Sequence, residues 1–211
     1  MKIPEISLSE ICPPDIPIKV FIPEFESGGV YLNELICLDQ IVATFKPGRI
    51  FEIGTFNGRT TLNFAANSPV SAKVFTLDLP EESAGATVLR AHDRDPKYKA
   101  LRKVGCHFKT SIYSAKITQL FGDSATFDYS PFAGTMDLVF VDGAHSCDYV
   151  ISDSLKTLPL LTPGRGITLW HDYGTWDEVT DTLDELYERN PEFASIRHIR
   201  GTSLVIRGLY R

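Results

Sequence analysis

The chain of 211 residues has the length of a single domain. Its 43% hydrophobic and 23% charged residues exclude disordered, collagenous and coiled-coil chains. No apolar run suits a transmembrane helix or a signal peptide, the net charge of −6 argues against nucleic-acid binding, and no run of like charges suggests a membrane-binding patch. The four cysteines lack zinc-binding spacing, so we expect a cytoplasmic protein with reduced thiols.

The first 29 residues contain five prolines and end in Gly28 and Gly29, which predicts an irregular arm. Apolar residues then recur at spacings of three and four between residues 30 and 45, and Pro47 and Gly48 follow. This spacing predicts an amphipathic helix that ends at the proline. We therefore divide the chain into an arm, residues 1–29, and a domain, residues 30–211.

Short apolar runs alternate with helical segments along the rest of the chain. The predicted strands are 49–53, 73–77, 117–121, 137–141, 166–170, 195–199 and 203–207. Helices are expected after Gly58, from Asp95 to Gly105, between residues 147 and 158, and after a capping box of Thr175 and Glu178. This alternation predicts an α/β fold, a doubly wound and mostly parallel sheet of seven strands with an antiparallel strand from the C-terminal hairpin.

Four of the predicted strands lead into an aspartate at or near their ends: Asp78, Asp123, Asp142 and Asp172. The carboxyl ends of parallel strands meet at one edge of the sheet, where doubly wound folds bind ligands. Aspartate is also common in helix caps and turns, so a single one would signify little. Four at one edge, together with Glu52, would repel phosphates and attract hydroxyls, amines, sulfonium groups or metal cations.

The loop after the first of these strands reads Gly54-Thr55-Phe56-Asn57-Gly58. Its glycines allow a tight turn and the close approach of a ligand to the backbone. Their spacing matches neither the dinucleotide-binding nor the phosphate-loop fingerprint. Asp78 ends the next strand, where a carboxylate can accept hydrogen bonds from two ribose hydroxyls. Together they predict a nucleoside ligand without a pyrophosphate.

In chain order the motifs are Phe51-Glu52-Ile53-Gly54-Thr55-Phe56-Asn57-Gly58, Leu77-Asp78, Gly122-Asp123-Ser124, Val141-Asp142-Gly143-Ala144-His145-Ser146 and Trp170-His171-Asp172-Tyr173. This ordered set resembles the class I S-adenosylmethionine-dependent methyltransferases, which have a Rossmann-like fold. It is most similar to the small-molecule O-methyltransferases of the macrocin and catechol types. The resemblance spans about residues 30–208 and includes the closing hairpin.

The resemblance implies a role for each motif. S-adenosyl-L-methionine would be the cofactor, and a small molecule would accept the methyl group on a hydroxyl oxygen. Asp142, His145 and His171 would be the catalytic residues that face the methyl group and the acceptor. The residues implied in cofactor binding are Glu52 for the amino group, Gly54, Thr55, Asn57 and Gly58 for the methionine part, Asp78 for the ribose, and Asp123 and Ser124 for the adenine.

The same resemblance implies a divalent cation. Some catechol-type relatives bind Mg²⁺ through two aspartates and an asparagine, and Asp142 and Asp172 match the aspartates, so they are the expected ligands of Mg²⁺ or Mn²⁺. Tyr173 stands in place of the asparagine and is a poor ligand for Mg²⁺ at neutral pH. Adjacent carboxylates repel each other, so a cation or the imidazolium of His171 should lie between them. The residues leave open whether His171 is a general base, a metal ligand or structural.

Three other functions remain open from the sequence. His145 and His171, with Asp142 or Asp172, would supply the two-histidine, one-carboxylate ligand set of an iron oxygenase. A nicotinamide-dependent oxidoreductase fits the glycine spacing poorly, and a non-catalytic nucleoside-binding protein is the third alternative. The sequence identifies neither the acceptor nor whether the chain forms a homo-oligomer. The segment 90–95 mixes both charge signs and is expected to be a solvated loop.

Overall fold

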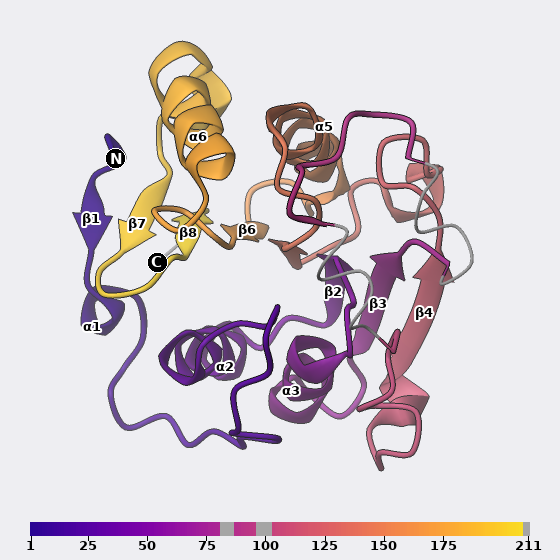
Figure 1. Ribbon diagram of the computed structural model, residues 1–211. Helices are drawn as coiled ribbons and strands as arrows, with labels where there is room; N and C mark the ends of the chain where they lie inside the picture. The colour runs from indigo at the N-terminus through magenta and orange to yellow at the C-terminus, as the bar shows by residue number, and fades with distance from the viewer. Residues whose placement is uncertain (81–86, 96–102, 209–211) are drawn as a thin grey trace.

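The computed structural model describes residues 1–80, 87–95 and 103–208. An eight-stranded sheet crosses the molecule in the order β1-β7-β8-β6-β5-β2-β3-β4 (Figure 1). β8 pairs antiparallel with β6 and β7, and the other neighbouring pairs are parallel. The predicted fold class is confirmed, with one strand more than expected. The strands are β1 (Glu5–Ile6), β2 (Arg49–Ile53), β3 (Lys73–Asp78), β4 (Ile117–Phe121), β5 (Leu138–Val141), β6 (Ile167–Trp170), β7 (Arg197–Ile199) and β8 (Val205–Arg207).

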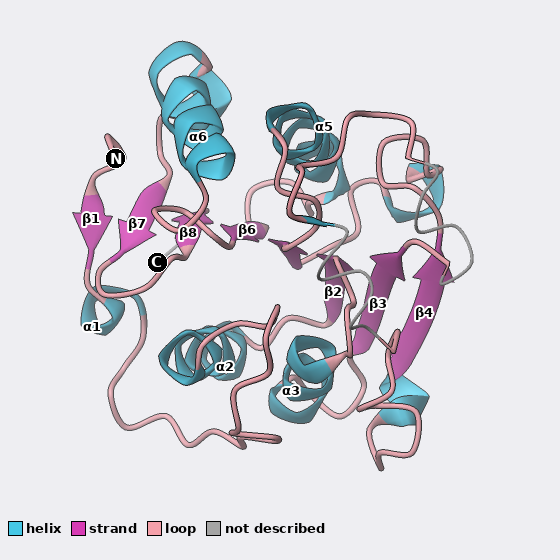
Figure 2. Cartoon of the chain, in the orientation of Figure 1, coloured by secondary structure: helices cyan, strands magenta, loops and turns pink. Residues whose placement is uncertain are grey.

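Two pairs of helices cover the two faces of this sheet (Figure 2). Side chains alternate along β2, where Ile50 packs into the apolar cluster under the first pair and Phe51 into the cluster under the second. Burial on both faces explains why the strands are nearly continuous apolar runs. Within the described residues, no helix is long and apolar enough to span a bilayer. The first pair is α2 (Leu32–Phe45) and α3 (Arg59–Asn67), and the second is α5 (Cys147–Thr157) and α6 (Asp177–Arg189).

The sheet grows in opposite directions from β2. The chain adds β3 and β4 on one side of it, then returns to place β5 and β6 on the other side (Figure 1). The loops that follow β2 and β5 therefore diverge, which leaves a crevice at the carboxyl ends of these strands. Gly54, Asp78, Asp142 and His171 follow or end four adjacent strands and meet at this edge of the sheet.

The arm is more ordered than predicted. Residues Glu5–Ile6 form the extra strand, β1, which pairs with β7 at the edge of the sheet, and α1 (Leu8–Ile11) follows it. Further along, Arg59 of α3 donates hydrogen bonds to the carbonyl oxygens of Ile22 (2.6 Å) and Val30 (2.7 Å). Because these partners lie far away in the sequence, the proline content of the arm gave no sign of them.

Two helix predictions have other outcomes. The expected helix of residues 95–105 falls mainly outside the described residues. The predicted capping box is wrong, because the hydroxyl of Thr175 donates to the backbone oxygen of Asp172 (3.0 Å) instead of capping α6. Glu178 accepts from the backbone N–H of Cys147 at the start of α5 (2.9 Å). A local turn therefore occupies the Thr175 side chain, and a tertiary contact occupies that of Glu178.

Gly54 holds the two sides of the crevice together. Its φ is +98°, and a Cβ built on it would lie 1.9 Å from the carbonyl oxygen of Asp142. The backbones after β2 and β5 therefore lie so close together that there is no room for a side chain at position 54.

We expect Gly54→Ala to lower the free energy of unfolding by about 3 kcal/mol or more, because the backbone overlap adds to the cost of a left-handed L-residue. Gly134→Ala is the matched control, with φ +67° and no atom within 4 Å of the added Cβ. It should lose only about 1 kcal/mol. Urea unfolding measures both variants, and equal losses would contradict the close approach at Gly54.

Candidate active site

A cavity of about 510 Å³ lies at the carboxyl ends of β2, β3, β5 and β6. Other lining residues include Phe25 near the end of the arm, Tyr31 just before α2, and residues of the segment 87–95. The structure brings eight of the predicted site residues into this lining: Gly54, Asp78, Asp123, Ser124, Asp142, His145, His171 and Asp172. All four of the aspartates at the strand ends are among them, and they outnumber Arg94 in the same lining, so the cavity is acidic.

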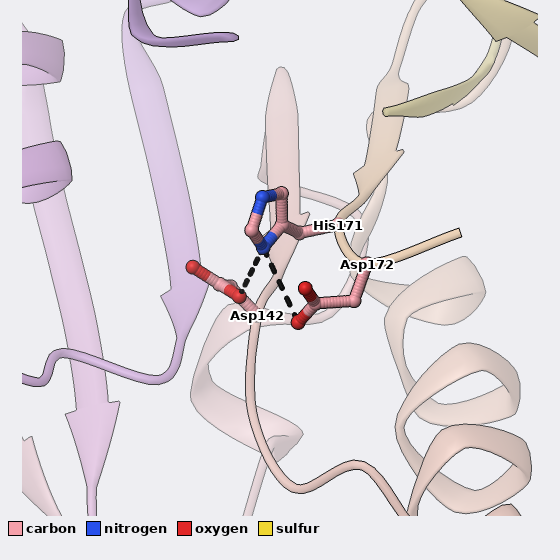
Figure 3. Close-up of side chains that lie close together, drawn as sticks. All are labelled: Asp142, His171 and Asp172. Carbon is pink, nitrogen blue, oxygen red and sulfur yellow. Dashed lines mark hydrogen bonds and ion pairs between the residues drawn. The ribbon is translucent and has the colours of Figure 1, made fainter. Parts of the chain in front are cut away.

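His171, which follows β6, lies between two of these carboxylates (Figure 3). Its Nδ1 is 2.9 Å from Oδ1 of Asp142 and 3.3 Å from Oδ2 of Asp172, and its Nε2 is 3.0 Å from Oε2 of Glu34. Burial lowers the pKa of His171, but the charges of Asp172 and Asp142 outweigh burial and raise this pKa well above its ordinary value. The ring therefore donates from both nitrogens and is the cation expected between the two aspartates.

Glu34 is a site residue that the sequence analysis missed. It belongs to the first turn of α2 and is 2% exposed. Its Oε1 accepts from the N–H and the hydroxyl of Ser203, both at 2.7 Å. Burial raises the pKa of Glu34, but the bonds and charge of His171 and the bonds of Ser203 lower it to about 2, so the group is ionised. The only sign of it in the sequence was an acidic residue four positions before Leu38 on the apolar face of the helix.

His145 has a similar environment on the other side of Asp172. Its Nε2 is 2.9 Å from Oδ2 of Asp172, its Nδ1 is 2.6 Å from Oδ1 of Asp95, and its ring stacks on Trp176 with centroids 3.8 Å apart. Burial lowers the pKa of His145, but the bonds and charges of Asp172 and Asp95 outweigh burial and raise it to about 9. Both histidines thus hold protons at neutral pH, which argues against either as a ready general base.

The mixed-charge segment is a solvated loop in part, because Arg90, Asp93 and Arg94 are exposed, but Asp95 departs from the prediction. Asp95 is 4% exposed because it pairs with His145. Arg90 Nη2 lies 2.5 Å from Oε2 of Glu178, at the start of α6. The N–H of Val88 donates to Oδ2 of Asp123 (2.8 Å). Thr87, Arg94 and Asp95 line the cavity, and the distant partners of Arg90 and Asp95 are contacts that local charge patterning does not reveal.

One group of side chains has the arrangement of a metal site. The ligand atoms of Asp142, His171 and Asp172 all lie within 4.8 Å of one another, the only such group of His, Cys, Asp or Glu side chains in the described part of the chain. His145 is not a member of this group. The two-histidine set of an iron oxygenase therefore does not form among the described residues.

The part of the chain that forms this cavity is similar to a known protein family. A family described as "Methyltransferase domain" matches residues 51–173, from β2 to the residue after Asp172. The chain belongs to this family. The resemblance to class I S-adenosylmethionine-dependent methyltransferases is thereby confirmed, and the matched residues include every strand end that contributes to the cavity. A search of curated proteins found no match.

Solved structures share the fold of this methyltransferase. The S-adenosylhomocysteine (SAH)-bound methyltransferase PaMTH1 of Podospora anserina is similar with a TM-score of 0.61 and 16% identity, over 88% of this chain and 81% of that one. An O-methyltransferase of Bacillus cereus in complex with SAH gives 0.57 and 16%, over 88% and 84%. At such low identity the likeness establishes the fold, and the chemistry has to be argued from the site itself.

Four residues expected to bind the cofactor do not line the cavity of the methyltransferase. Glu52 is fully buried, and the hydroxyls of Thr61 and Thr76 donate to its Oε2. Gly58 makes room for the ring of Phe108, because a Cβ there would lie 2.5 Å from that ring. These contacts build the loop after β2 rather than a ligand surface. The other two residues also bond within the protein, Thr55 to the hydroxyl of Thr76 (2.7 Å) and Asn57 to the N–H of Lys103 (2.7 Å).

Tyr173, the residue in place of the asparagine, also lies outside the cavity lining. It is 1% exposed, and its hydroxyl donates to Oδ1 of Asp184 (2.5 Å) and accepts from the N–H of Lys2 (2.9 Å). Its side chain therefore attaches the start of the arm to α6. Tyr173 therefore differs from the catechol-type motif in two ways. The asparagine oxygen that would bind the cation is missing, and the phenol of Tyr173 does not point into the cavity to replace it.

The buried carboxyl group of Glu52 should make the free energy of unfolding depend on pH. Burial raises the pKa of Glu52 to about 8, against the bonds from Thr61 and Thr76 that lower it. The folded protein holds this proton more tightly than the unfolded chain, so its contribution to stability is complete below pH 4.5 and is lost as the pH rises to about 8. Glu52→Gln should therefore gain stability relative to the wild type between pH 5 and 8, by at most about 1.4 kcal/mol per pH unit. Urea unfolding at pH 5, 7 and 9 tests this, and parallel pH profiles of the two proteins would mean that Glu52 is ionised in the fold.

Proposed function

We propose that the protein transfers the methyl group of S-adenosyl-L-methionine to a hydroxyl oxygen of a small-molecule acceptor. The observation that carries the proposal is the acidic cavity at the switch point of a methyltransferase fold, with Gly54 and Asp78 on its first wall. An acidic lining favours a positively charged sulfonium over a phosphate-bearing cofactor. The similar structures from Podospora anserina and Bacillus cereus, both solved with SAH, support the same cofactor.

Asp78 suits the ribose of this cofactor. Backbone N–H groups of Phe56 and Leu79 donate to its Oδ2 (2.9 Å) and Oδ1 (2.7 Å), which fixes the carboxylate at the end of β3. A carboxylate accepts about four hydrogen bonds, so two ribose hydroxyls complete the set. Asp123 and Ser124 follow the neighbouring strand β4 and would lie beside the adenine.

The acceptor would lie on the side of Asp142 and Asp172. These two carboxylates and His171 fit a divalent cation in number, spacing and chemistry. When bound, such a cation would lower the pKa of an acceptor hydroxyl and make its oxygen a better nucleophile, and Asp142, Asp172 and His171 would hold it. As the oxygen–methyl bond forms, the sulfur–methyl bond breaks, its electron pair stays on the sulfur of SAH, and the hydroxyl proton would pass to the carboxylate of Asp142 or Asp172 or to water. The acidic lining stabilises the positive charge on the sulfonium and then on that proton.

The end of the arm would contact the acceptor. Phe25 and Tyr31 line the mouth of the cavity and stack with ring centroids 5.0 Å apart, although both are more than half exposed. Exposed aromatic rings at a cavity mouth offer apolar area to a ligand and displace water when it binds. The segment 87–95 closes the cavity from the other side, so a bound acceptor is aligned with the methyl group and shielded from water.

The Asp78 assignment predicts a selective loss of cofactor binding. Calorimetric titration of the wild type should show binding of S-adenosylmethionine and SAH and none of NAD. Asp78→Ala should weaken SAH binding by about 2–4 kcal/mol, because two charge-assisted hydrogen bonds are lost, and Asp78→Asn should lose less. Asp181→Ala, at an exposed position of α6, is the control and should bind normally. Micromolar binding of NAD without a response to SAH would refute the proposed function.

A further inference from the structure

The cluster at the acceptor side carries an inference about the metal itself. We infer that His171 is a ligand of the cation and that its site, completed by Asp142 and Asp172, prefers Mn²⁺ to Mg²⁺. The inference rests on the proposed function only in assigning the cation to the acceptor side of the cavity. It deepens that function by naming the third ligand and the class of ion.

The spacing of the three donor atoms is that of a coordination sphere. Metal–ligand distances of roughly 2.0–2.2 Å place neighbouring ligands roughly 3.0 Å apart in an octahedron and 3.4 Å apart in a tetrahedron. Nδ1 of His171 is 2.9 Å from Oδ1 of Asp142 and 3.3 Å from Oδ2 of Asp172 (Figure 3). The side chains can therefore share one ion with little movement, and the ion takes the place of the proton on Nδ1.

A second, independent observation is the fixed orientation of the His171 ring. Its far nitrogen, Nε2, is held 3.0 Å from Oε2 of Glu34, and Glu34 is itself held by the two hydrogen bonds from Ser203. Metal-binding histidines characteristically donate their other ring N–H to a carboxylate, which sets the tautomer and makes the ligand more basic. Glu34 is thus a positioning residue that keeps Nδ1 directed at Asp142 and Asp172.

The chemistry of the donor set decides between the two ions. Mg²⁺ prefers oxygen ligands and keeps much of its water shell, so an imidazole in the first shell is unfavourable for it. Mn²⁺ binds carboxylates and water well and gains more than Mg²⁺ from a nitrogen ligand. The Tyr173 hydroxyl bonds Asp184, so Tyr173 does not take the place of the asparagine ligand, and in the described part of the chain the ring nitrogen of His171 is the third donor of the group.

Mn²⁺ binding to the full-length, chelator-treated protein tests this inference without the need for an acceptor. Calorimetric titration should show one Mn²⁺ site per chain, bound at least tenfold more tightly than Mg²⁺. Pulsed electron paramagnetic resonance of the Mn²⁺ complex should show coupling to ¹⁴N from a coordinated imidazole. Absence of Mn²⁺ binding, equal affinity for Mg²⁺, or a Mn²⁺ complex without ¹⁴N coupling would each overturn the inference.

Variants separate the ligand from its positioning residue. His171→Asp replaces the nitrogen with an oxygen, so the ¹⁴N coupling should disappear and the preference for Mn²⁺ should shrink. Glu34→Gln should weaken Mn²⁺ binding about tenfold while keeping the coupling, since the ring remains a ligand but loses its charged partner. Asp181→Asn is the control, because Asp181 is exposed on α6 and does not belong to the cluster, and it should bind Mn²⁺ normally. Retained coupling in His171→Asp would overturn the inference.

A titration with SAH on the same samples keeps the two proposals distinct. Binding of SAH without binding of Mn²⁺ refutes the metal inference and leaves the proposed cofactor standing. Binding of Mn²⁺ without binding of SAH refutes the proposed function and leaves the metal site standing.

Discussion

The site depends on two histidine rings that are held between four carboxylates. Glu34, Asp142 and Asp172 surround His171, and Asp172 and Asp95 surround His145. Buried charges are costly unless each has partners, so every member of this network constrains the others. Because the members come from α2, from the ends of β5 and β6 and from the segment 87–95, the network holds four separate parts of the chain at one edge of the sheet.

Asp172 is the shared member of this network. Its Oδ2 lies 2.9 Å from His145 and 3.3 Å from His171, and its backbone adopts a left-handed conformation with φ +69°. The charges of both rings lower the pKa of Asp172, against the burial that raises it, so it stays ionised. One carboxylate thus couples the proposed metal site to the second histidine, and a change at either ring alters the charge that the other one faces.

Two layers of the site have different origins. The carboxyl ends of the parallel strands form the floor of the cavity and carry its aspartates. The strand order alone places this floor at the switch point of the sheet. The walls come from the arm and the segment 87–95, which are held by contacts such as those of Arg59 with the arm and of Asp123 with Val88. Structures of 16% identity share the fold, and loops vary more among related proteins than the sheet that supports them, so we expect the walls to differ from those structures more than the floor does.

The sequence by itself determined the sheet, α2 and the acidic edge. Apolar periodicity reports burial, and strand ends in a parallel sheet share one edge whatever the details of packing, so the strand pattern was enough to place Asp78, Asp123, Asp142 and Asp172 together. The tertiary structure alone decided that Glu34 and Asp95 pair with the histidines and that Glu52 and Tyr173 turn into the protein. Those outcomes rest on hydrogen bonds and ion pairs between residues far apart in the chain, which leave no periodic trace in the sequence.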